Sequence, residues 1–177
     1  MQGIVTFLDE SNEKQIKSLW ELLDLQCDLS GIQKTPYPHF SWQFGDHYEL
    51  APIQERLELL CKHVRRFHVL AAGLGIFPGQ NPVIYVSLVK TEHLINLHRV
   101  LWEEFAPFSM DIFPYYAPNR WMPHITLAYH DVTVDNLGCA LREIAFKPFE
   151  IEISVNHLAL VYQEDHSVGV IRRYDFR

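Results

Sequence analysis

Apolar residues recur along this chain with two different periods, which predicts helices and strands in alternation. One helical stripe, in residues 52–64, consists of Ile53, Leu57, Leu60, Cys61 and Val64. Residues 149–155 instead alternate apolar with polar side chains, as a strand with one buried face does. Residues 158–162 continue as an apolar run, so we expect that strand to extend to residue 162.

The spacing of apolar residues along the whole chain predicts four helices and seven strands. The helices are expected at 12–29, 52–64, 92–105 and 134–146, the last using Val134, Leu137, Leu141 and Ile144. The strands are expected at 3–8, 38–45, 67–77, 83–89, 122–130, 149–162 and 168–175. Pro78 to Pro82 and residues 164–166 are the expected turns, and residues 106–121 the expected long loop.

The order of these elements predicts the fold class. Strands come mostly in adjacent pairs joined by short turns, with helices between the pairs, and each of the strands at 38–45 and 122–130 is followed by a helix. This order favours an α+β fold of antiparallel or mixed sheets over a doubly wound parallel sheet. Because no linker, low-complexity segment or charge block interrupts the chain, we expect one domain over residues 1–177, built from two related lobes.

Composition and charge exclude several classes of function. The formal net charge of −7 argues against a protein that coats nucleic acid through a broad basic surface, but it leaves room for a nucleotide or RNA-end site. No apolar run approaches the roughly 18 residues of a membrane span. The N-terminal residues are typical of a first strand and not of a signal peptide, so we expect a cytoplasmic protein with no membrane partner. We also expect the protein to be a monomer.

The three cysteines, Cys27, Cys61 and Cys139, have a spacing that matches no metal motif. Each lies in a predicted helix. We expect all three to be reduced residues of the core, as in an intracellular protein.

One short pattern occurs twice and points to chemistry. Pro38-His39-Phe40-Ser41-Trp42 and Pro123-His124-Ile125-Thr126-Leu127 share the order proline, histidine, apolar, hydroxyl, apolar. None of the other eight histidines has a hydroxyl residue two positions later. In a strand the histidine and the hydroxyl point to the same face, so Phe40, Trp42 and Phe44 should face the core while His39, Ser41 and Gln43 face away.

With these two motifs the chain resembles the 2H phosphoesterase superfamily, in its 2′-5′ RNA ligase-like branch, which is defined by two His-x-Thr/Ser-x motifs. The order of elements and the segment Phe77-Pro78-Gly79 are also similar. The resemblance implies two pseudo-symmetric lobes facing each other across a central cleft, each contributing one motif strand. Many relatives have a basic residue three positions after the second-motif threonine, where this chain has Tyr129.

The chemistry of phosphodiester cleavage assigns roles to the motif residues. One group must take a proton and another must supply one, and histidine suits both because its ordinary pKa is about 6.5. We therefore expect His39 and His124 to be the catalytic pair, and Ser41 and Thr126 to bind the phosphate.

The predicted activity is metal-independent hydrolysis of 2′,3′-cyclic phosphate or 2′-5′ phosphodiester bonds in nucleotides or RNA ends. No cofactor is expected, since the sequence has neither His-Glu-x-x-His nor paired Cys-x-x-Cys. Two alternatives stay open: an RNA 2′-5′ ligase that runs the reverse reaction, and a nucleotide or RNA-end binding module with little turnover. Tyr37 could stack on a base or pack on a lobe, and Arg120 could approach the phosphate or lie on the surface.

Overall fold

Four helices form where apolar residues recur at helical spacing, and side-chain caps fix two of their starts. They are α1 (Glu10–Cys27), α2 (Leu50–Cys61), α3 (Glu92–Phe105) and α4 (Leu137–Ile144) in this computed structural model, which describes residues 1–148, 150–164 and 167–177. Asp9 accepts a hydrogen bond from the backbone N–H of Asn12, and Thr91 accepts one from that of Leu94. None of the described helices is both long and apolar enough to cross a membrane.

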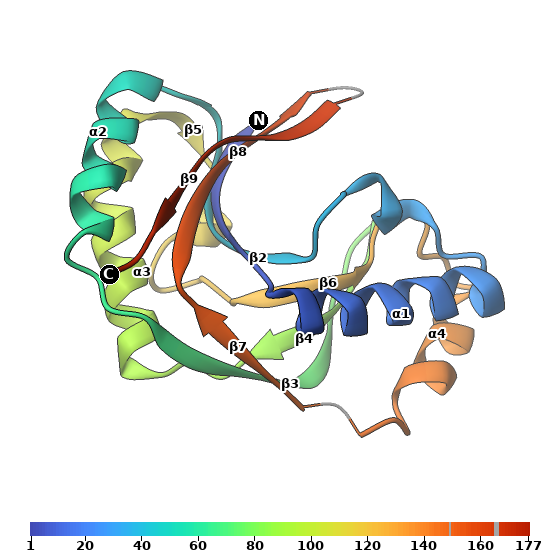
Figure 1. Cartoon of the computed structure of the whole chain (residues 1–177). Coiled ribbons are helices and arrows are strands. Elements are labelled where there is room, and N and C mark those ends of the chain that lie inside the picture. Colours follow the sequence, from blue (N-terminus) through green and yellow to red (C-terminus); the bar gives the residue numbers. More distant parts are fainter. Residues whose placement is uncertain (149, 165–166) are drawn as a thin grey trace.

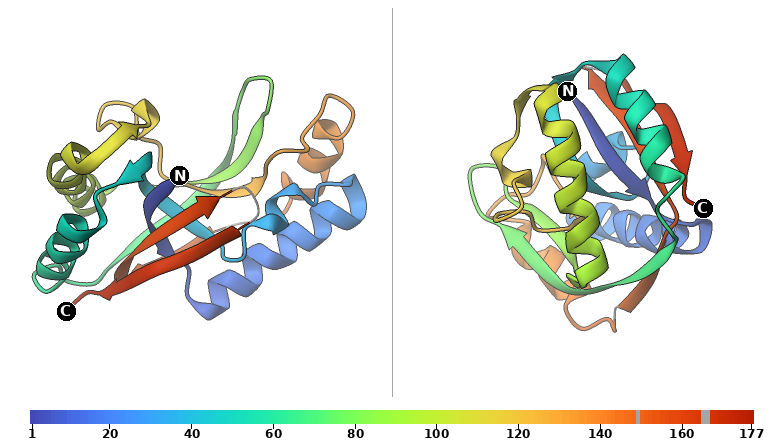
Figure 2. Two further views of the ribbon diagram at one scale, coloured as in Figure 1. Left: turned by 90° about the horizontal axis from the view of Figure 1, so that it is seen from above. Right: turned by 90° about the vertical axis from the view of Figure 1, so that its left-hand side faces the viewer.

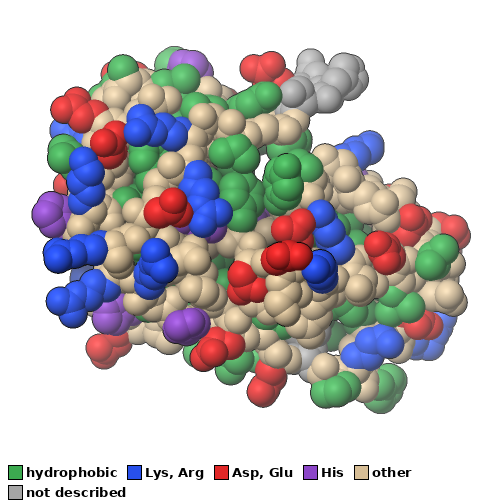
Figure 3. Space-filling view, viewed as in Figure 1, with side chains coloured by type: hydrophobic (Ala, Val, Ile, Leu, Met, Phe, Trp, Pro, Cys, Tyr) green, Lys and Arg blue, Asp and Glu red, His purple; other side chains and the backbone are tan. Residues whose placement is uncertain are grey.

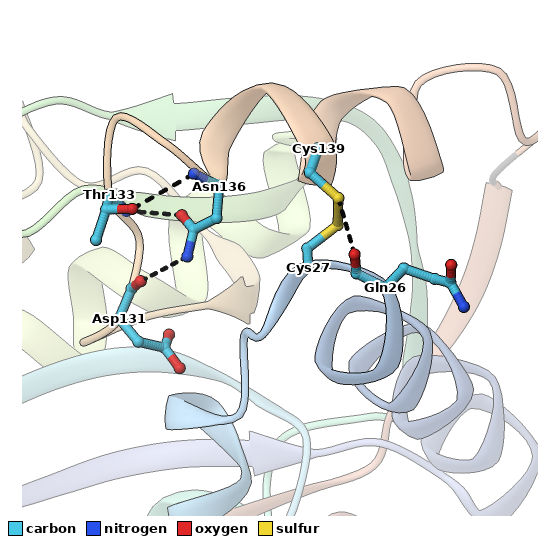
Figure 4. The surroundings of a disulfide bond; sticks show 6 residues. All are labelled: Gln26, Cys27, Asp131, Thr133, Asn136 and Cys139. Atoms are coloured by element: carbon cyan, nitrogen blue, oxygen red, sulfur yellow. Dashed lines mark hydrogen bonds between the residues drawn. A yellow bond between two sulfur atoms is a disulfide. The ribbon is translucent and has the colours of Figure 1, made fainter.

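Helix α4 begins three residues later than the sequence pattern predicts. Thr133 and Asn136 exchange side-chain-to-backbone hydrogen bonds, which hold residues 133–136 in a turn instead of a first helical turn (Figure 4). Val134, predicted to lie on the buried face, is 92% exposed.

The nine strands of the described chain form one curled sheet. They are β1 (Gln2–Phe7), β2 (His39–Tyr48), β3 (Phe67–Phe77), β4 (Val83–Leu88), β5 (Ser109–Ile112), β6 (His124–Ala128), β7 (Glu150–Val155), β8 (His157–Glu164) and β9 (Ser167–Asp175). Their order is β7-β3-β4-β6-β2-β1-β8-β9, with β5 added to β2, and each of these pairings is antiparallel. The predicted α+β class is confirmed.

The two motif strands, β2 and β6, are neighbours in the middle of this sheet. Outward from them run two halves of four strands each, β6-β4-β3-β7 and β2-β1-β8-β9, which correspond to the two predicted lobes. Helices α1 and α4 pack on one another at the β6 half, while α2 and α3 cover β8, β9 and β2 (Figures 1 and 2). Each motif strand therefore starts its half of the sheet at the molecule's centre.

Two predicted segments differ from the structure. The expected long loop at 106–121 contains the short strand β5, which pairs with β2, between two single-turn 3-10 helices at 106–108 and 114–116. The strand expected to run continuously to residue 162 is broken at Asn156, because β7 pairs with β3 and β8 pairs with β1. Of the predicted turn at 164–166, residues 165 and 166 lie outside the described residues, as does Phe149.

A bulge in β2 corrects the predicted facing of two side chains. Ile4 pairs with Gln43, but Val5 pairs with Ser41, so Trp42 is an extra residue in β2. The alternation is therefore shifted by one position. Gln43 is buried with Trp42, whereas Phe44 turns to the face that carries the histidines.

The prediction of three reduced cysteines is wrong for two of them. Cys27 ends α1 and Cys139 lies in the first turn of α4, and the packing of these helices brings their Cα atoms to 5.7 Å and their sulfurs into a disulfide (Figure 4). Cys61 is a free, buried thiol, and burial raises its pKa to about 12. The expectation of an intracellular compartment rested in part on reduced cysteines and loses that part of its support.

Candidate active site

The two motifs meet because their strands pair at a single point. Phe40 pairs with Ile125, and both side chains are fully buried on the core face. In this antiparallel register His39 is opposite Thr126, and Ser41 is opposite His124. All four side chains are half-buried and line one cavity of about 860 Å³. The structure thus brings together the four residues that the motifs single out.

Both histidines are held in the same way by their own backbone. Nδ1 of His39 lies 2.9 Å from the carbonyl oxygen of Tyr37, and Nδ1 of His124 lies 2.7 Å from that of Met122. Because a carbonyl oxygen only accepts, each Nδ1 carries the hydrogen and each Nε2 is left as the nitrogen that can act on a ligand.

The prolines of the two motifs also have equivalent places. The carbonyl oxygen of Pro38 accepts a hydrogen bond of 3.2 Å from the N–H of Leu8, and that of Pro123 accepts one of 2.9 Å from Leu88. Leu8 follows β1 and Leu88 ends β4, the strands that flank the motif strands. Proline therefore directly precedes each motif strand without presenting an unpaired N–H.

A pair of tryptophans, which the sequence motifs do not include, extends the symmetry. The indole N–H of Trp121 donates to the carbonyl oxygen of Ser41 at 2.9 Å, and that of Trp20 donates to the carbonyl oxygen of Thr126 at 3.0 Å. Each hydroxyl residue is thus fixed through its backbone by a tryptophan that also lines the cavity. The helical spacing of Trp20 predicts burial but not this contact.

Aromatic rings surround the two imidazoles and set their protonation. The ring of His124 lies 4.9 Å from that of Phe77 and 5.1 Å from that of Tyr85, while His39 lies 6.3 Å from Phe7. Burial among these groups lowers the pKa of both histidines, and the proximity of His124 lowers that of His39 further. Both imidazoles are therefore mainly neutral at pH 7 in the free protein.

The ring of Tyr85 can lie beside His124 because it crosses a glycine. Gly75 is the cross-strand partner of Tyr85, and a Cβ at this position would overlap the tyrosine ring. Gly3 is related to Phe44 in the same way across β1 and β2. These glycines admit rings that support or line the site.

The two weaker candidates also line the cavity. Tyr37 is 46% exposed and packs edge-on against Phe7 at 5.6 Å. Arg120 is exposed at the rim, with its guanidinium 5.4 Å from the centre of the Tyr115 ring. Both lie where a ligand could contact them.

Two further tyrosines reach the cavity. The Ser41 hydroxyl interacts with the hydroxyl of Tyr116, whose pKa burial raises to about 12. Tyr129 lines the wall as well. Within the described part of the chain, no three His, Cys, Asp or Glu side chains gather as metal ligands would.

Comparisons with known proteins show which family this chain is similar to. Residues 8–167 match the model of the 2′-5′ RNA ligase superfamily. The sequence has no significant match among curated proteins.

Two solved structures share the fold. One is the protein TT0787 of Thermus thermophilus, with 19% identity, a TM-score of 0.61, and coverage of 99% of this chain and 97% of that one. The other is Escherichia coli LigT complexed with 3′-AMP, with 15% identity, a TM-score of 0.64 and the same coverage. The family match over most of the chain and the paired motifs lead to one conclusion: this chain belongs to the 2′-5′ RNA ligase superfamily.

Proposed function

We propose that this protein is a metal-independent phosphodiesterase that hydrolyses 2′,3′-cyclic phosphate or 2′-5′ phosphodiester bonds in nucleotides or RNA ends. The observation that carries the proposal is the pair of imidazoles, each with Nδ1 bound to a carbonyl oxygen and Nε2 left for a ligand in one shared cavity. The nucleotide 3′-AMP bound to LigT, a protein of the same fold, supports a nucleotide ligand.

The arrangement suits an in-line displacement at phosphorus. One neutral imidazole removes a proton from the attacking water, and the other, as imidazolium, protonates the leaving ribose oxygen. Ser41 and Thr126 donate hydrogen bonds to the non-bridging oxygens and hold the phosphate between the two bases. Because the pKa of both free imidazoles is lowered, the anionic phosphate itself favours the protonated form of the one that acts as acid.

The same groups run in reverse would join a cyclic phosphate to a 5′-hydroxyl, which is the ligase alternative. A product assay separates the possibilities. The purified protein is incubated with nucleoside 2′,3′-cyclic phosphates, 2′-5′-linked dinucleotides, and RNA pairs bearing a cyclic end and a 5′-hydroxyl. We expect hydrolysis that EDTA does not change and that either His39→Ala or His124→Ala lowers strongly.

The matched control is His47→Ala, an exposed histidine further along β2, which should retain full activity. Ligated RNA as the main product would favour the ligase. Binding of nucleotides without turnover of any substrate would favour the binding module. Activity lost in EDTA and restored by a divalent metal would refute the metal-independent mechanism.

A further inference from the structure

The cavity wall carries very little charge for a site that binds phosphate. Among the described residues that line it, Arg120 alone has a charged side chain, and none is Asp or Glu. The two histidines add little positive charge, because burial lowers the pKa of each. The side chains of the wall thus offer one permanent cation, two mainly neutral imidazoles, and otherwise uncharged hydroxyl and amide groups to an anionic ligand. The α-ammonium of Met1, another lining residue, donates a hydrogen bond to the carbonyl oxygen of Gln163.

No other Lys or Arg side chain of the described residues lines the cavity, and several of them pair with carboxylates. Lys and Arg side chains gather over the side of the molecule formed by α2 and β9 (Figure 3). There Arg56 pairs with Glu104, and both Lys62 and Arg172 pair with Glu58. None of these groups lines the cavity.

The rest of the wall is mostly aromatic and apolar. Eleven of its residues are Phe, Tyr or Trp, including Phe7 and Phe44 in one half of the sheet and Phe77 in the other. A volume of about 860 Å³ is ample for a nucleoside with its reacting phosphate. A second phosphate in this space would lose water with few cations available to pair with it, and burial of an unpaired charge is costly.

We propose that the substrate carries a single phosphate, the one that reacts, on an otherwise uncharged nucleoside-like body, and that this site selects against ligands with any further phosphate. The proposal rests on the proposed function for the identity of the reacting bond. It names as substrates small nucleoside cyclic phosphates, and not cyclic phosphates that carry a 5′-phosphate, a diphosphate bridge or a polynucleotide chain.

The kinetic test compares two substrates that differ by one phosphate: adenosine 2′,3′-cyclic phosphate and its 5′-phosphorylated form. We expect kcat/KM to be at least about tenfold lower for the second. The variant Tyr129→Lys adds a cation to the wall and should reduce the difference in kcat/KM between the two substrates. The control Tyr129→Leu should leave that difference unchanged. Equal kcat/KM values, or a preference for the 5′-phosphorylated substrate, would overturn the proposal.

A binding test keeps the inference separate from the proposed function. The dissociation constants of 3′-AMP and adenosine 3′,5′-bisphosphate are measured by calorimetry at several salt concentrations. We expect 3′-AMP to bind more tightly, with a shallow salt dependence because few charges are paired. If no substrate is turned over, the proposed function fails, but the two dissociation constants still test whether the site selects against a further phosphate. Equal or tighter binding of the bisphosphate would refute that selectivity.

Discussion

His157 should make the folded protein sensitive to acid, although it lies outside the cavity. Its ring is buried and accepts a hydrogen bond of 3.1 Å at Nε2 from the backbone N–H of Phe7. Its Nδ1 lies 2.7 Å from the side-chain oxygen of Asn156, to which it donates. Both nitrogens are thus committed to the neutral form, and burial lowers the pKa to about 4. Phe7 of β1 pairs with His39 of β2, so the hydrogen bond between Phe7 and His157 also supports the candidate site.

The sign and size of the effect follow from linkage. In the unfolded chain the imidazole has its ordinary pKa of about 6.5, so below that pH the unfolded state binds the extra proton and folding stability falls. The loss approaches 1.4 kcal/mol per pH unit and totals about 3 kcal/mol once the pH reaches 4. Because a domain's whole stability is about 5–15 kcal/mol, this loss is readily measured.

The assay is urea unfolding followed by circular dichroism between about pH 8 and pH 4. His157→Gln removes the titrating group, so its unfolding free energy should start lower but fall less steeply with acid. His68→Gln, a change at an exposed histidine of β3, is the control and should follow the wild type. Parallel profiles for wild type and His157→Gln would refute the coupling between this ring and folding.

Three more predictions follow from the structure. Reduction of the disulfide between α1 and α4, whose cysteines are 112 residues apart, should lower the unfolding free energy by roughly 5 kcal/mol in the loop-entropy model. The control Cys61→Ala should respond to reductant as the wild type does. A urea midpoint that reductant does not alter would contradict the bond. Gly75→Ala should displace Tyr85 and lower kcat by about tenfold or more. The control Gly138→Ala should leave kcat unchanged, because its Cβ would meet only a side-chain end of Arg142 at 3.6 Å. Equal kcat values for Gly75→Ala and the wild type would contradict the supporting role of Tyr85. The profile of kcat/KM against pH should be bell-shaped with its maximum below about pH 6.5, because the pKa of both motif histidines is lowered; a maximum above pH 7.5 would contradict the assignment.

Local patterns were sufficient for most elements of this fold. Apolar spacing predicts helix 92–105 with the bounds that α3 has, and the runs flanking the Pro78–Pro82 turn predict β3 and β4. The doubled motif predicts His39, Ser41, His124 and Thr126, because strand geometry alone places each pair on one face.

Features that depend on distant partners could not be predicted in this way. The Cys27–Cys139 bond depends on how α1 packs against α4, which no local spacing encodes. The bulge at Trp42 depends on the register with β1, and it exchanges the facing of Gln43 and Phe44. The break at Asn156 reflects the choice of a new partner strand, although the change from alternating to continuous apolar residues is a trace of it.

The most direct test of the central claim compares His39→Ala, His124→Ala and the double variant on adenosine 2′,3′-cyclic phosphate. If the two imidazoles act in one transition state, each single change should lower kcat/KM by at least about a hundredfold. The double variant should then be little worse than the poorer single variant, because a base without its acid partner has lost most of its effect. Near wild-type activity in either single variant would contradict the two-histidine mechanism.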